Sequence, residues 1–149
     1  MAPAAPAPPV SDIAATWQHI LLLHAGVESE LATALQRRHG LGLSEFRALG
    51  HLAASPTSEL RMQELADRIG LNQSSVTRLV ARLNVAEFTY RDPCPDDKRG
   101  VYTVITERGR ARYAEASRTY DKTLNAALAE AGRADPQLAA TLTVLGAAH

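Results

Sequence analysis

The segment spanning residues 65–109 constrains the fold of this chain more than any other. It begins with two short amphipathic stretches joined by a tight turn, LADRIGLNQSSVTRLVARL, and continues as two strand-like stretches around a charged loop, FTYRDPCPDDKRGVYTVITERG. A helix pair of this kind can enter the major groove of DNA, and a basic hairpin loop beside it can reach the neighbouring minor groove. The order of these elements therefore predicts a winged helix.

The turn between the two predicted helices is the most specific feature of this segment. Two helices that cross steeply need a small residue where they touch, which Ala66 supplies, and the turn needs a residue that tolerates the left-handed conformation, which is Gly70. This spacing predicts one helix over residues 61–69 and a second that begins after Asn72, a good N-cap. The second helix is expected to bury one face, formed by Val76, Leu79, Val80 and Leu83.

The opposite face of this second helix is polar and locally basic. Residues 71–84 contain two arginines and no acidic residue. Polar groups near the helix start can bond base edges, and cations further along can contact phosphates. We therefore expect DNA contacts from Asn72, Gln73, Ser74, Ser75, Thr77, Arg78 and Arg82.

The following hairpin completes the predicted DNA-binding unit. Residues 88–92 and 101–105 are rich in aromatic and β-branched residues, which is typical of strands. Arg99 in the loop can enter a narrow minor groove, where the negative potential is high. We expect Asp97 to pair with Arg99 and hold its side chain extended, so that less rotamer entropy is lost on binding. The predicted DNA contacts of the wing are Asp97, Lys98 and Arg99.

Long amphipathic helices are predicted on both sides of this unit. In residues 12–38, apolar positions recur at alternating spacings of four and three: Ile13, Trp17, Ile20, His24, Val27, Leu31 and Ala34. In residues 106–131, after a Thr106 cap, a similar pattern follows: Gly109, Tyr113, Ala116, Tyr120, Thr123, Ala127 and Ala131. Asp135 and Pro136 start a last helix with Leu138, Leu142 and Leu145 on one face. One protomer has little else to cover these stripes, so we expect a two-fold homodimer built from the terminal helices.

The whole chain is thus expected to be mainly α with a small β-hairpin: a winged helix-turn-helix lobe plus a helical dimerisation lobe built from N- and C-terminal helices. A helix over residues 44–54, capped by Ser44, is predicted to open the DNA-binding domain, which spans 41–105. The dimerisation region comprises 11–40 and 106–149, and residues 1–10 form an Ala/Pro tail that we expect to be disordered.

Composition excludes several classes of protein. The net charge is zero, so any basic surface must be local, and a single cysteine excludes an intramolecular disulfide framework. The longest aliphatic run covers residues 20–23, far short of the roughly 20 needed to cross a bilayer, and the N-terminus lacks the pattern of a signal peptide. We expect a cytoplasmic protein. No catalytic arrangement of Ser, His, Cys or carboxylates is visible, so we predict no enzyme, no cofactor and no metal.

The order of these motifs resembles that of the MarR family of bacterial regulators. The resemblance covers residues 12–147 and is most specific where LADRIGLNQSSVTRLVARL is joined to DDKRGVYTVITERG. It implies an obligate dimer that binds pseudo-palindromic operators, usually represses transcription and is released by small aromatic or phenolic ligands. By position it assigns groove reading to Gln73, Ser74, Ser75, Thr77 and Arg78, and the wing pair to Asp97 and Arg99.

One residue departs from the family pattern. Glu87 occupies a position where many members have glycine, at the exit of the recognition helix. Glutamate enters the left-handed region with difficulty. We therefore expect the helix to run on or to end through a different turn.

Several polar residues leave alternatives open. His24 can face a ligand pocket with Trp17, Arg47 and His51, or it can be a neutral histidine buried in the dimer core. A zinc site would use His24 and Glu28, but the last long helix offers Arg108 and Arg112 rather than further ligands.

Two other classes of function are alternatives to a ligand-released repressor: a thiol-based redox sensor and a protein-interaction module. Cys94 in the wing can be a solvated loop thiol or the switch of a thiol-based redox sensor. The other alternative is a winged-helix protein-interaction module, or an antagonist that dimerises with a true regulator.

Overall fold

A computed structural model describes residues 4, 6–93 and 100–147 of the chain. Within these ranges the chain forms six helices and three strands. In order they are α1 (Asp12–His39), α2 (Leu43–Ala54), β1 (Glu59–Arg61), α3 (Met62–Ile69), α4 (Gln73–Val85), β2 (Thr89–Asp92), β3 (Tyr102–Ile105), α5 (Glu107–Ala134) and α6 (Pro136–Ala147). The mainly helical fold class is confirmed, and the predicted helix and strand positions hold to within a few residues.

The sheet has one strand more than the predicted hairpin. Its order is β1-β3-β2, with both neighbours antiparallel to β3, and Leu60 pairs with Thr103. The three residues of β1 carry no period-two pattern long enough to recognise, and their partner lies about forty residues along the chain. The third strand joins the start of the helix-turn-helix to the wing.

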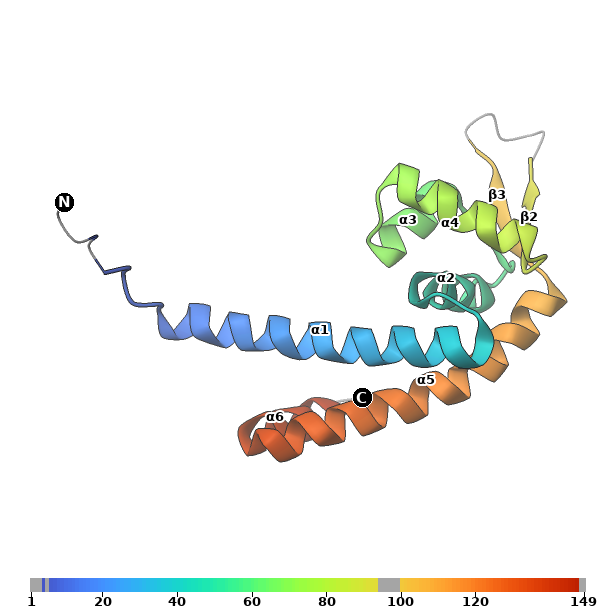
Figure 1. Ribbon diagram of the computed structural model, residues 1–149. Coiled ribbons are helices and arrows are strands. Elements are labelled where there is room, and N and C mark those ends of the chain that lie inside the picture. Colours follow the sequence, from blue (N-terminus) through green and yellow to red (C-terminus); the bar gives the residue numbers. More distant parts are fainter. Residues whose placement is uncertain (1–3, 5, 94–99, 148–149) are drawn as a thin grey trace.

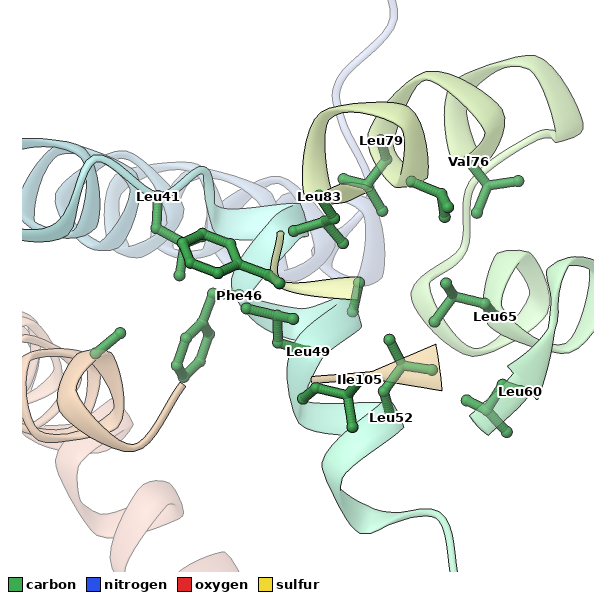
Figure 2. Close-up of a cluster of buried hydrophobic side chains, with 14 of the residues drawn as sticks. Leu41, Phe46, Leu49, Leu52, Leu60, Leu65, Val76, Leu79, Leu83 and Ile105 are labelled. Atoms are coloured by element: carbon green, nitrogen blue, oxygen red, sulfur yellow. The ribbon is translucent and has the colours of Figure 1, made fainter. Parts of the chain in front are cut away.

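The hydrophobic core lies where α2, α3, α4 and the sheet meet (Figure 2). Phe46, Leu49 and Leu52 face inward from α2, as predicted, and pack against Leu65 of α3 and Ile105 of β3. Ala66 is buried at the crossing of α3 and α4, and α4 buries its predicted face of Val76, Leu79, Val80 and Leu83. These contacts fix the orientation of the exposed face of α4.

The elements form two lobes (Figure 1). The winged-helix lobe consists of α2, α3, α4 and the sheet. The long helices α1 and α5 pack along each other, and α6 folds back beside the end of α5. The first half of α1 extends beyond the winged-helix lobe, so that lobe does not cover it.

Most helix ends are capped by nearby residues, which include the predicted Asn72, Gly70 and Thr106. Ser11, Asn72 and Thr106 accept hydrogen bonds from the backbone at the starts of α1, α4 and α5, while Gly40 and Gly70 adopt the left-handed conformation after α1 and α3. Because each of these caps involves residues that are close together in the chain, the sequence reveals it directly.

The cap predicted for α2 is wrong. Ser44 lies inside the helix, and Gly42 occupies the N-cap position. Glu45 supplies the side-chain bond instead: its Oε2 accepts a hydrogen bond from the Gly42 amide at 3.3 Å. A carboxylate three residues into a helix can cap the preceding backbone from inside the first turn, and here it takes the place of the serine hydroxyl.

The prediction for Glu87 is also wrong, because this residue does enter the left-handed region, with φ of 63°. The Phe88 amide donates to the Leu83 carbonyl and the Glu87 amide to the Asn84 carbonyl, both at 3.0 Å, which is the Schellman pattern. The Thr106 hydroxyl also donates to the Glu87 carbonyl at 2.7 Å. Three hydrogen bonds therefore hold a conformation that the side chain disfavours.

We predict that Glu87→Gly stabilises the protein. Glycine removes a left-handed penalty of about 1–2 kcal/mol and costs roughly 0.5–1 kcal/mol of chain entropy, so the free energy of unfolding should rise by about 0.5–1 kcal/mol. Denaturant titration measures this change. Glu87→Ala is the matched control, because it removes the carboxylate but keeps a Cβ; a gain as large in the alanine variant would contradict the backbone explanation.

Candidate nucleic-acid interface

The exposed face of α4 carries the residues predicted to read DNA. Asn72, Gln73, Ser74, Thr77, Arg78 and Arg82 are exposed, and Ser75 is half-buried. Three of them are tied to one another or to the backbone: Asn72 Oδ1 accepts from the Ser75 amide and the Ser74 hydroxyl, both at 2.9 Å, and Thr77 donates to the Gln73 carbonyl.

This arrangement divides the α4 surface into fixed and available groups. Within the part of the chain that the structure describes, the side chains of Gln73 and Arg78 have no hydrogen-bond partner. An amide and a guanidinium are the side chains that form bidentate bonds with adenine and guanine, respectively. Gln73 and Arg78 are therefore the groups on α4 best suited to contact base edges.

Arg82, about one turn beyond Arg78 on α4, is held by an ion pair. Its Nε donates to Glu45 Oε1 at 3.0 Å, while the other oxygen of Glu45 caps α2. The Arg82 side chain is 59% exposed, so its outer nitrogens remain open to solvent. The pair fixes one rotamer of a cation on the rim of the recognition helix, which suits a phosphate contact more than a base contact. The sequence did not suggest this pairing, because the two residues lie 37 positions apart.

A groove of about 420 Å³ separates α4 from the start of the wing. Polar groups of α4 line one side of it, and β2 with the end of the wing loop lines the other. Its lining residues are Met62, Gln73, Thr77, Val80, Ala81, Asn84, Arg91, Gly100 and Val101. Arg91 was not among the residues predicted from the sequence, because a strand position by itself does not reveal which element the side chain faces.

The predicted wing contacts Asp97, Lys98 and Arg99, and the thiol of Cys94, lie outside the described residues. The strands that carry this loop are described, and their register places Thr89 opposite Ile105 and Asp92 opposite Tyr102. The roles of the loop residues stay predictions from the sequence.

A second candidate site lies between α2 and α5. A cavity of about 490 Å³ is lined by Phe46, Arg47, Gly50, His51, Tyr113, Ser117, Tyr120 and Asp121. The Phe46 ring stacks on Tyr120 with centroids 4.7 Å apart. Of the four residues predicted for a ligand pocket, Arg47 and His51 line this cavity, whereas Trp17 and His24 do not.

Trp17 and His24 instead lie on the exposed side of α1. His24 is 69% exposed, and its Nε2 lies 3.9 Å from Glu28 Oε1, so burial of this histidine within one protomer is excluded. Helical periodicity placed both residues on one stripe of α1, but it could not show that the stripe is exposed at these two positions.

Arg47 connects the two lobes. Its two terminal nitrogens donate to the two carboxylate oxygens of Glu28 on α1, at 2.8 and 2.6 Å. The hydrogen bond from Arg47 lowers the pKa of Glu28 below its ordinary value of 4.5, and Glu28 in turn raises the pKa of Arg47. Because the Glu28 pKa is depressed in the folded state, the stability contributed by the pair is present above about pH 4.5 and is lost as the pH falls through the lower folded value.

His51, the other predicted residue in the cavity, favours its neutral form more than an exposed histidine does. Burial, and then the charge of Arg68, lower its pKa from the ordinary value. The cavity thus combines aromatic walls, one guanidinium and a predominantly neutral imidazole at neutral pH.

The N-terminal half of the predicted dimerisation stripe on α1 is exposed in the single chain, and its C-terminal half is not. Ile13 is 81%, Trp17 58% and Ile20 47% exposed, whereas Leu31 and Leu35, nearer the winged-helix lobe, are buried against the rest of the protomer. Large apolar side chains gathered on one helix mark a contact surface. Leu138 and Leu142 of α6 are half-buried and Val144 is 70% exposed, which adds to this surface.

Two other properties bear on the classes of protein considered above. Among the described residues, no three His, Cys, Asp or Glu side chains come together in a way that could hold a metal ion. The described helices also include none that is both long and apolar enough to span a membrane.

The fold and its polar α4 surface define the class of protein: a winged helix-turn-helix protein with long flanking helices. Residues 39–100 match the sequence model of the MarR family. The chain is 35% identical over 72 residues to the HTH-type transcriptional regulator MhqR of Bacillus subtilis, and this match spans about half (48%) of each protein.

Two solved structures share the fold over nearly their full length. Sco3205, a MarR family transcriptional regulator from Streptomyces coelicolor solved in complex with DNA, is 24% identical with a TM-score of 0.76, covering 94% of this chain and 90% of its own. NadR, solved in complex with 4-hydroxyphenylacetate, is 22% identical with a TM-score of 0.67, covering 93% and 96%. The sequence match over residues 39–100 and the shared fold confirm the resemblance to the MarR family that the motifs predicted.

Proposed function

We propose that the protein is a homodimeric, sequence-specific DNA-binding transcriptional regulator. The observation that carries the proposal is the surface of α4, where Gln73 and Arg78 stand exposed on a helix without acidic residues. The buried face of α4 is fixed by the core, so the exposed face is presented rigidly. DNA bound to Sco3205, a protein of the same fold, supports the assignment.

Dimerisation is part of the proposal because the α1 stripe of Ile13, Trp17 and Ile20 needs a cover. A second copy of the chain presents the same stripe, and a two-fold axis lets the two stripes cover each other. Two-fold symmetry also repeats the recognition helix, and two copies about 34 Å apart would match one turn of DNA and a pseudo-palindromic operator.

We further propose that the protein acts as a repressor released by a small aromatic acid or phenol that binds in the cavity between α2 and α5. Phe46 and Tyr120 can stack on a ring, and Arg47 can bind a carboxylate or phenolate. A ligand anion would compete with Glu28 for Arg47, and so loosen the contact between α1 and α2. NadR binds such a phenolic acid in a related fold.

The test is selection of duplexes from a random-sequence pool by the full chain, followed by footprinting of the DNA that flanks its own gene. The proposal expects one enriched, inversely repeated motif and a protected site of matching symmetry. Titration of aromatic acids such as 4-hydroxyphenylacetate into the complex then examines release. Absence of any enriched motif would favour the alternative, a winged-helix protein-interaction module.

We predict that Gln73→Ala relaxes sequence discrimination. Loss of one bidentate base contact costs about 1–3 kcal/mol against the preferred base, so the ratio of specific to non-specific affinity should fall by roughly tenfold or more. Competition between the enriched duplex and single-base variants measures this ratio. Gln63→Ala on α3 is a matched control, because Gln63 bonds to Asp67 one turn along its own helix. Equal loss of discrimination in both variants would contradict a base contact by Gln73.

A further inference from the structure

Arg91 lies on the face of β2 that is turned toward the recognition helix. Alternate residues of a strand share a face, so Arg91 is on the same side as Thr89. The Thr89 hydroxyl donates to Asn84 Oδ1 of α4 at 2.6 Å, which fixes this face of the strand against the helix. Arg91, two residues nearer the wing loop, therefore projects beside α4 rather than away from it.

The groove between α4 and β2 gives Arg91 a polar setting that contains no acid from the described part of the chain. Its α4 wall carries the amide of Gln73, the hydroxyl of Thr77 and the amide of Asn84. None of the described residues that line it is acidic. Among the described residues Arg91 forms no ion pair, and it is exposed, which lets an incoming anion reach its guanidinium.

This groove and the Arg82–Glu45 pair lie on opposite flanks of α4. At 100° per residue, Arg82 lies about 160° around the helix from the groove-lining positions Gln73, Thr77 and Asn84. The buried residues Val76, Leu79 and Leu83 occupy the arc between these flanks on the core side. The exposed face of α4 is thus bordered by Arg82 on one side and by Arg91 on the other.

We propose that Arg91 binds a backbone phosphate of duplex DNA on the wing side of the recognition helix. A helix in the major groove has a sugar-phosphate strand along each flank, so a cation on each flank meets one strand. Arg91 then contributes affinity that is independent of sequence, whereas Gln73 contributes discrimination. The proposal rests on the DNA-binding function proposed above and adds a contact that the wing-loop arginine does not supply.

The experiment measures the affinity of the full chain for the enriched duplex and for an unrelated duplex of equal length, over a range of salt concentrations. Counterion release predicts that Arg91→Gln makes the slope of log K against log salt less negative by about 0.9 for each bound protomer, with at least about tenfold weaker binding near 0.1 M salt. Both duplexes should lose affinity by the same factor. Arg91→Lys should restore the slope, because it keeps the charge.

Two controls separate this result from general damage. Arg118→Gln removes an exposed arginine from α5, in the other lobe, and should leave the slope unchanged. Arg91 has no ion-pair partner among the described residues, so the midpoint of thermal unfolding should not change in Arg91→Gln.

The outcomes distinguish this inference from the function on which it rests. If the parent chain binds with a steep salt slope and Arg91→Gln has the same slope, the phosphate contact is refuted while the DNA-binding function stands. A loss confined to the enriched duplex would mean that Arg91 contacts a base, which also refutes the proposal. If the parent chain binds neither duplex, both proposals fail together.

Discussion

Trp17→Glu combined with Ile20→Glu should convert the protein to a monomer and weaken operator binding by at least about a hundredfold. Both side chains are large, apolar and about half exposed on α1 in the single chain. Around a two-fold axis each substitution appears twice, so four carboxylates would enter one apolar contact, and burial of an unpaired charge costs several kcal/mol. Linkage of two half-site contacts is worth about 10²–10⁴ in affinity, and a monomer forfeits this gain.

Sedimentation velocity gives the oligomeric state, and fluorescence anisotropy with the enriched duplex gives the affinity. Val10→Glu is the control, because it exchanges an apolar residue that is more exposed (69%) and precedes α1. Circular dichroism should show the helix content of the parent in the double variant, since the winged-helix core does not involve these residues. A double variant that still sediments as a dimer would place the interface elsewhere, and a monomer with full affinity would show that one winged helix suffices.

The features that the sequence predicted correctly are those that depend on neighbours along the chain. Gly70 marks the turn of the helix-turn-helix, Thr106 marks the start of α5 and Asp135 the start of α6. Each involves a hydrogen bond or a backbone angle within about four residues. The apolar period of α4 likewise identified its buried face, and hence the face on which Gln73 and Arg78 are exposed.

The features that it missed depend on contacts between distant residues. Glu87 is left-handed because Thr106, 19 residues away, and the Schellman bonds hold its backbone. The cap of α2 is local but was assigned to the wrong residue, since Glu45 and not Ser44 accepts the Gly42 amide; the distant part is the bond from Arg82 to the other oxygen of Glu45. Periodicity shows which residues share a helix face, but not which element that face meets.

The two candidate sites show the same difference between local and distant contacts. Residues of α4 could be assigned from one helix alone, whereas the cavity between α2 and α5 needs tertiary structure. That is why Arg47 and His51 line the cavity while Trp17 and His24 do not. Arg91 was overlooked because its relevance comes from the Thr89–Asn84 bond, which turns its strand face toward α4.

The second large effect is expected from Gly109→Ala in the first turn of α5. A Cβ at this position would lie 2.2 Å from the Phe88 carbonyl oxygen, which is a backbone atom and cannot swing aside. The same oxygen accepts the Thr106 amide at 3.0 Å, and the Phe88 amide is bonded to Leu83 at the end of α4. Relief of the clash would therefore displace the joint between the recognition helix and the wing.

We expect Gly109→Ala to lower the free energy of unfolding by about 3 kcal/mol, the upper part of the range for overpacked sites. For a protein of this size the midpoint of thermal unfolding should fall by about 10 °C. Because the displaced backbone joins α4 to β2, the fraction that remains folded should also bind the enriched duplex more weakly than the parent does.

Gly26→Ala provides the contrast that identifies the cause. Gly26 lies inside α1, where an added Cβ would have no atom within 4 Å apart from its chain neighbours and the backbone of its own helix, so alanine should keep or raise the melting temperature through its higher helix propensity. If Gly109→Ala melted like the parent, the close approach of Phe88 and α5 would have to relax at little cost. The joint would then be adaptable, and Glu87→Gly would be expected to alter DNA affinity as well as stability. A large loss in Gly109→Ala beside an unchanged Gly26→Ala instead identifies the contact of Phe88 with the first turn of α5 as the feature that sets the angle between recognition helix and wing.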